Sequence, residues 1–148
     1  MNDKARYLGL DYGAKTVGVA ISDPLLMGAT PIETIKRDRE NKIRKTLSRI
    51  EEIIREYDVD EIVLGLPLNM DGSEGERCKK TREFGEMLEK RVGLKINYFD
   101  ERLSSFEAHE LLDEHGIKPN NHKEHIDKLA AMVILEGYLS LCRKKEEN

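Results

Sequence analysis

The chain has 148 residues, of which 39% are hydrophobic and 36% are charged, and its formal net charge is −4. This length favours a single domain whose core buries roughly 68–70% of the unfolded surface. The negative charge argues against indiscriminate binding to nucleic acid, and no apolar run approaches the roughly 20 residues that span a bilayer. Cys78 and Cys142 belong to no Cys-x-x-Cys pair, so we expect reduced thiols and a cytoplasmic protein without a membrane partner.

The first third of the chain predicts three strands joined by short turns. The turn residues are Gly13-Ala14 and Asp23-Pro24. Connections this short make consecutive strands antiparallel neighbours. The strands are expected at residues 6–11, 17–22 and 27–35.

Helices and strands alternate in the rest of the chain. Residues 39–57 predict an amphipathic helix, because apolar side chains recur there at helical spacing. Residues 60–66 contain Ile62-Val63-Leu64, a continuous apolar run that is typical of a strand buried on both faces. Further helices are expected at 76–92, 104–115 and 124–142, a strand at 95–99 and a loop at 116–123.

The order of these elements predicts an α/β fold with a mixed five-stranded sheet and helices on both faces. Right-handed crossovers place the strands in the order 3-2-1-4-5, with the first, fourth and fifth strands parallel. The carboxyl ends of these three strands then share one edge, where open α/β sheets bind ligands. We expect one domain over residues 1–142 and a disordered tail at 143–148.

The charge is unevenly distributed along the chain. Residues 36–55 contain eight basic and four acidic side chains, so this segment carries +4 and the remainder carries −8. Two interpretations remain open. An acidic cation-binding pocket beside a basic helix produces this division, and so does a solvated helix with ion pairs four residues apart.

Acidic residues follow two of the strands that reach the shared edge. Asp11 ends the first strand, although an Asp ahead of Gly13 also fits a turn-capping role. Asp100 and Glu101 follow the fifth strand. Successive strand residues point to opposite faces, so only one of this pair is expected to face Asp11, while the other can bond Arg102.

Asp127 is the third candidate acid. It shares a helical stripe with apolar residues such as Ala131 and Tyr138, and a carboxylate on such a stripe is costly to bury unless it is paired or binds a cation. Alternatively, Asp127 is a first-turn acid that the helix dipole favours. His122 and His125 stand nearby without Cys partners, so a surface role fits them better than a zinc site.

Three carboxylates from two strand ends and one helix would form a cage for two divalent ions. Mg²⁺ or Mn²⁺ ions held about 3.5–4 Å apart support in-line attack on a phosphodiester. We assign Asp11, Glu101 and Asp127 as catalytic, and the same three with Asp100 as metal ligands. Polar side chains around this edge are candidates for contact with nucleic acid, and each of them taken alone is equally a solvated surface group. They are Lys15, Asn69, Arg77, Lys80, Arg102 and Lys123.

Four segments resemble motifs of the YqgF (RuvX) family. In order along the chain they are Gly9-Leu10-Asp11-Tyr12-Gly13 and its continuation to Ala20, the segment 65–73, Asp100-Glu101-Arg102-Leu103-Ser104, and Asp127-Lys128-Leu129-Ala130-Ala131. The resemblance implies a ribonuclease-H-like fold related to the RuvC resolvases. It also implies that Asp11, the Asp100-Glu101 pair and Asp127 are the metal-binding acids. Thr16 departs from the Arg that the family commonly has there, which removes one potential phosphate contact.

The same resemblance implies a cytoplasmic bacterial nuclease that matures the 5′ end of pre-16S ribosomal RNA. We therefore expect a Mg²⁺- or Mn²⁺-dependent endonuclease acting on precursor rRNA or within ribosomal precursor particles. The main alternative is a resolvase of four-way DNA junctions, which would need a dimer, and the sequence leaves monomer or homodimer open. Further alternatives are a non-catalytic RNA-binding assembly factor and a phosphotransferase of the sugar-kinase type, although the latter requires two lobes.

Overall fold

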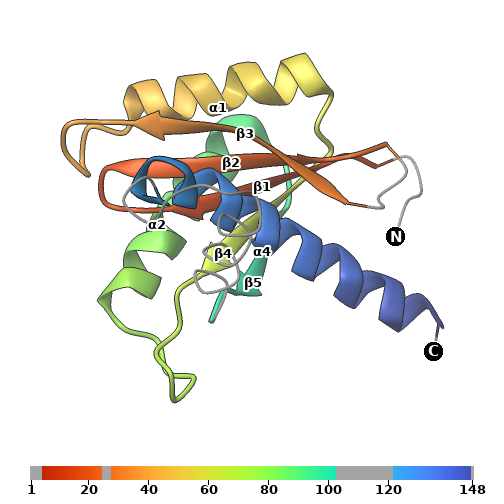
Figure 1. Ribbon diagram of the computed structural model, residues 1–148. Helices are drawn as coiled ribbons and strands as arrows, with labels where there is room; N and C mark the ends of the chain where they lie inside the picture. The colour runs from red at the N-terminus through yellow and green to blue at the C-terminus, as the bar shows by residue number, and fades with distance from the viewer. Residues whose placement is uncertain (1–4, 25–27, 103–121, 148) are drawn as a thin grey trace.

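The computed structural model describes residues 5–24, 28–102 and 122–147. Their centre is a five-stranded sheet in the order β3-β2-β1-β4-β5 (Figure 1), which confirms the predicted order. Its strands are β1 (Tyr7–Tyr12), β2 (Thr16–Ser22), β3 (Ala29–Lys36), β4 (Glu61–Leu66) and β5 (Ile96–Asp100). The helices are α1 (Arg44–Tyr57), α2 (Glu76–Val92) and α4 (His122–Glu147). The helix expected at 104–115 and the loop that follows it, up to residue 121, lie outside the described residues.

The strand directions agree with the connections between the strands. β1 pairs antiparallel with β2, and β2 pairs antiparallel with β3, because short turns join them. β1–β4 and β4–β5 are parallel pairs, as expected for strands joined by helical crossovers. The carboxyl ends of β1, β4 and β5 therefore lie at the same edge of the sheet.

Strand alternation divides the core into two layers on opposite faces of the sheet. Leu8 and Leu10 of β1 belong to the layer beneath α1 and α2, which also contains Phe84. Tyr7 of the same strand belongs to the layer beneath α4, together with Leu135. Figure 1 shows α4 crossing one face of the sheet, with α1 and α2 on the other.

Two helix ends differ from the prediction. α1 begins at Arg44, five residues later than expected, because the preceding residues form a turn in which the Lys42 amide donates to the Arg39 carbonyl (3.0 Å). α4 continues through Glu147, past residue 142 where the last helix was expected to end. Within the described residues, no helix combines the length and apolar character needed to cross a membrane.

Candidate active site

Asp11 lies at the carboxyl end of β1 on the face that α4 covers. Strand alternation places Tyr7, Gly9 and Asp11 on this face, while Leu10 and Tyr12 point into the opposite layer. The Asp11 side chain is half-buried. It therefore stands at the junction between the apolar contact with α4 and the open edge of the sheet.

Glu101 is the member of the acidic pair that faces Asp11. Its backbone amide donates to the Leu66 carbonyl (3.2 Å), which extends the pairing of β5 with β4 by one residue. Its carboxylate lies over Gly65 of β4, where even a methyl group would overlap it. A hydrogen bond joins the Asp11 and Glu101 side chains.

Asp100 points away from this pair, as the alternation of strand residues requires. Its Oδ2 accepts from Arg102 Nε (2.8 Å) and its Oδ1 accepts from the Arg102 backbone amide (3.0 Å). These bonds lower the pKa of Asp100. The expectation that one acid of the pair bonds Arg102 is therefore met by Asp100, while its assignment as a metal ligand stays a prediction.

Asp127 approaches the same edge from the first turns of α4. Its backbone carbonyl passes directly over Gly18 of β2, the residue that pairs with Asp11 in the sheet register. The carboxylate of Asp127 raises the pKa of Asp11 by electrostatic repulsion. The predicted stripe is present, because Ala131 and Leu135 are fully buried against the sheet.

Burial and electrostatic repulsion disfavour the charged forms of Asp11 and Glu101 and so raise their pKa values. The pKa of Asp11 rises to about 6, first because burial disfavours its charged form and then because Asp127 repels it. The pKa of Glu101 rises to about 8 through burial, repulsion by Asp11 and their shared hydrogen bond. Arg77 opposes the shift of Glu101 without abolishing it. Without a cation, the edge therefore retains a proton near neutral pH.

This donor set suits Mg²⁺ or Mn²⁺ in its chemistry, because hard divalent cations prefer carboxylate oxygens. In the described part of the chain, no three His, Cys, Asp or Glu side chains converge closely enough to hold a metal as they stand. Asp11 and Glu101 are in contact and Asp127 acts on Asp11 from nearby.

Two of the predicted nucleic-acid contacts lie beside the acids and are already paired. Arg77 donates to Glu40 Oε2 (3.0 Å) and sits above the Tyr12 ring, at 5.7 Å from its centroid. Arg102, besides its bonds to Asp100, donates to the Met70 carbonyl (3.3 Å). These bonds hold both guanidinium groups near the edge.

The other predicted contacts are more dispersed. The Asn69 side chain donates to Ser73 Oγ (3.0 Å) and thereby stabilises the loop after β4. Lys15 is exposed in the turn between β1 and β2. Lys123 belongs to α4, but its side chain is outside those described.

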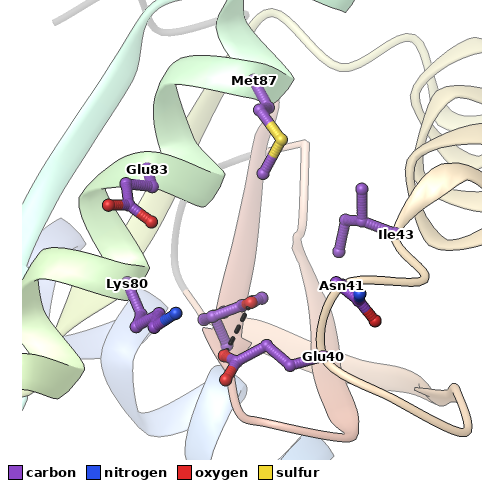
Figure 2. Close-up of a pocket in the computed structure, with 7 residues that line it drawn as sticks. Glu40, Asn41, Ile43, Lys80, Glu83 and Met87 are labelled. Carbon is purple, nitrogen blue, oxygen red and sulfur yellow. Dashed lines mark hydrogen bonds between the residues drawn. The ribbon is translucent and has the colours of Figure 1, made fainter.

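Lys80 lines a cavity of about 420 Å³ on the face of the sheet opposite to α4 (Figure 2). Tyr12 forms part of its wall and donates to Glu40 Oε2 (2.8 Å). The Tyr12 ring also stacks on Phe84, with 4.4 Å between the centroids. Lys80 is therefore directed to this cavity, while Asp11, the neighbour of Tyr12, faces the other side.

Glycines within the strands set the depth of this site, a role that the sequence motifs did not predict for them. At Gly18 an added methyl group would collide with the Asp127 backbone, and at Gly65 with the Glu101 carboxylate. At Gly9 it would lie 2.9 Å from the Ala131 carbonyl. Glycine inside a strand signals close approach of another backbone or ligand, so the sequence did contain the relevant signal.

Comparison with solved structures defines the class of fold. A Thermus thermophilus RuvC structure in complex with a Holliday junction substrate matches 93% of this chain and 96% of its own, with a TM-score of 0.58 and 10% identity. A second T. thermophilus RuvC structure matches 91% of this chain and 96% of its own, with a TM-score of 0.56 and 12% identity. The chain therefore has the ribonuclease-H-like fold of RuvC, and identities this low establish the fold alone.

Sequence comparison defines the family. The model of the family described as "RuvX: Holliday junction resolvase" matches residues 5–141. A protein of Agathobacter rectalis named "Putative pre-16S rRNA nuclease" is 56% identical over 134 residues, covering 90% of this chain and 94% of its own length. A protein of Lactobacillus johnsonii with the same name is 48% identical over 141 residues, covering 94% and 98%. The chain belongs to the RuvX family, which confirms the resemblance found in the sequence. The relatives with which it shares this family are named as nucleases.

Proposed function

We propose that this protein is a metal-dependent endonuclease that hydrolyses phosphodiester bonds at the 5′ end of pre-16S rRNA. The observation that carries the proposal is the contact between Asp11 and Glu101 at one sheet edge, with Asp127 near enough in α4 to repel Asp11. The names of the A. rectalis and L. johnsonii relatives support the choice of precursor rRNA as substrate. The work would take place in the cytoplasm, on free precursor or on ribosomal precursor particles.

Asp11, Glu101 and Asp127 would hold Mg²⁺ or Mn²⁺, as two ions. When bound, such ions lower the pKa of an attacking water and stabilise the departing 3′ oxygen. The residues of the chain provide the oxygen ligands and their placement. Burial, and then repulsion by a neighbouring acid (Asp127 for Asp11 and Asp11 for Glu101), raises the pKa values of Asp11 and Glu101, and the same repulsion would make this edge attract a cation.

Arg77 and Arg102 would position the substrate strand beside the acids. Each guanidinium is held by a carboxylate, Glu40 for Arg77 and Asp100 for Arg102. The planar fork of an arginine retains further donors for phosphate oxygens after one such pairing. In this arrangement Asp100 acts through Arg102 and only Glu101 of the acidic pair faces the reacting edge.

The test offers the purified protein a precursor 16S rRNA fragment and a four-way DNA junction side by side, with Mg²⁺ and then with Mn²⁺. We expect cleavage of the RNA at one position, and loss of cleavage in both Asp11→Asn and Asp127→Asn. Asp58→Asn is the matched control, because Asp58 is exposed, lies at the far edge between α1 and β4, and has a left-handed backbone that Asn tolerates. Cleavage by either site variant at the parent rate would contradict the assigned role of that acid.

The second candidate is resolution of four-way DNA junctions. The description of the family model and the fold shared with RuvC favour it. A resolvase must present two active sites to two strands, so this function requires a dimer. Symmetric cutting of the junction by a dimeric form, with the RNA left intact, would select this candidate over the first.

A further inference from the structure

A strongly basic cavity lies at the connection between β3 and α1, apart from the acids. Its volume is about 490 Å³. Five of its six lining residues are basic and the sixth is Asp38. The basic residues are Lys36, Arg37, Lys42, Arg44 and Lys45. This concentration of positive charge lies in the segment 36–55, which carries +4 in a chain whose net charge is −4.

Three of the five cations of this cavity are available to a ligand, whereas the Arg37 guanidinium already donates to the Gly13 and Glu40 carbonyls. Lys42, Arg44 and Lys45 are exposed, and none of them forms an ion pair with any residue of the described ranges. Arg49, on the next turns of α1, differs because it forms a two-pronged pair with Glu33. Within α1, Arg49 pairs with Glu52, three residues further on, whereas the first residues of the helix have no such partner among the described residues. The interpretation of residues 36–55 as a solvated helix with ion pairs four residues apart therefore fails at the beginning of α1.

The position of these charges opposes the stability of α1. Arg44 and Lys45 are its first two residues, the first turn contains no acidic residue, and no side chain caps the helix. A cation beside a helix N-terminus is unfavourable, since the unpaired amides there already carry partial positive charge. A bound anion would offset this cost, because it would interact favourably with the cationic side chains and with the amides of the helix N-terminus.

This cavity is joined to the edge that carries the acids. Arg37 donates through Nη2 to the Gly13 carbonyl (2.6 Å), and its backbone amide donates to the Lys15 carbonyl (2.9 Å). Gly13 and Lys15 form the turn that follows Asp11 in the chain. A line of positive charge therefore continues from the turn beside Asp11 to the beginning of α1.

We propose that the cavity formed by Lys36, Arg37, Lys42, Arg44 and Lys45 binds the phosphate backbone of the nucleic acid whose cleavage is proposed above. The inference rests on that function and adds a second contact region outside the acidic edge. Several unpaired cations spread over one concave surface suit successive phosphates of a strand. The backbone amides at the start of α1 add donors of the kind that bind phosphate.

The experiment measures binding of a fluorescent precursor 16S rRNA fragment by anisotropy, in EDTA so that no cleavage occurs, over a series of salt concentrations. The variant is Lys42→Gln/Lys45→Gln. Its control is Lys144→Gln/Lys145→Gln, which removes the same charge from exposed positions in the last turn of α4. Thermal melting verifies folding, and the variant is expected to melt no lower than the parent because its lost charges oppose the helix dipole.

We expect the variant to bind about 10- to 30-fold more weakly than the control at about 0.1 M salt. The slope of log K against log salt should fall by about 1.4, since each lost contact with a single strand contributes about 0.7. Equal affinity and slope in variant and control would overturn the proposal, as would a parent protein that binds neither this RNA nor a four-way DNA junction. If the parent binds the RNA more tightly than the variant but never cleaves it, the nuclease proposal is refuted and the proposal that the basic cavity binds phosphates still holds.

Discussion

Replacement of Gly18 by alanine tests whether the depth of α4 on the sheet builds the site. The residue lies on β2, opposite Asp11 in the register, and makes no contact with substrate in the proposed function. A methyl group at this position would overlap the carbonyl of Asp127 and lie 2.9 Å from the amide of Lys128. Both obstacles are backbone atoms, which cannot turn aside as a flexible side chain can.

The size of the effect follows from these contacts. Ordinary carbon–oxygen contact lies near 3.5 Å, so the first turns of α4 must move by about 1 Å or more. Overpacking of a close contact costs about 1–3 kcal/mol, which corresponds to a decrease in Tm of about 2–12 °C for a chain of this size. A displacement of about 1 Å at a catalytic group costs about 10²-fold in rate. We therefore expect a folded Gly18→Ala protein that has lost most of its activity.

The assay compares Gly18→Ala with the parent for cleavage of the RNA fragment in Mg²⁺ and for thermal unfolding. Gly28→Ala is the matched control, since a methyl group there meets no atom of the described residues closer than 3.8 Å. Parent-like cleavage and parent-like Tm in Gly18→Ala would refute the argument that close approach at Gly18 positions Asp127. A large loss of activity in Gly28→Ala would refute the same argument, because replacing a glycine that has no close contact would then be as harmful as replacing the closely packed Gly18.

Three further predictions concern charge and packing. In EDTA, the free energy of unfolding should fall by a few kcal/mol from about pH 5 to pH 8, because the pKa values of Asp11 and Glu101 are raised in the folded state to about 6 and about 8. The folded state then retains protons that the unfolded state has already released at its lower pKa values. Urea unfolding should show that Glu101→Gln removes most of this fall, and a rise in stability with pH in the parent would contradict the pKa shifts. Phe84 is fully buried against the Tyr12 ring, so Phe84→Ala should cost about 3–5 kcal/mol in urea unfolding, and a loss below about 1 kcal/mol would contradict its place in the core. Arg49 pairs with Glu33 at side-chain exposures of 37% and 30%, so Arg49→Gln should cost less than about 1 kcal/mol, and a larger loss that persists in high salt would contradict this estimate.

The sheet was predictable because each of its signals is local. Short turns made the first three strands antiparallel, and continuous apolar segments such as Ile62–Leu64 marked strands buried on both faces. The beginning of α1 was misplaced because Ile43 fits the apolar spacing of the helix although it precedes the first helical residue, and the polar residues 39–42 before it form a turn. Helical periodicity reports which face of a segment is buried, whereas a helix end is decided by capping and turn contacts.

The candidate site was predictable in its parts but not in its assembly. Strand alternation required Asp100 and Glu101 to face opposite ways, and the sequence alone left open which of them faces Asp11. The packed structure resolves this choice, because the Glu101 carboxylate lies over Gly65 and is hydrogen-bonded to the Asp11 side chain. Close approach between distant segments depends on the packed fold, so no local pattern specifies it.

The distribution of paired charges supports a cation at this edge more directly than the number of acids does. The cations nearest to the acids already have carboxylate partners, since Arg77 is bonded to Glu40 and Arg102 to Asp100. Burial and repulsion by Asp11 nevertheless raise the pKa of Glu101 to about 8, although Arg77 is near enough to oppose the shift. An arrangement selected for stability alone would direct one of these guanidinium groups at the acids, because a close opposite charge favours the ionised form of a carboxyl group. The fold instead leaves the acids to repel one another, and perturbed carboxylates at the ligand-binding edge of an α/β sheet are typical of functional sites.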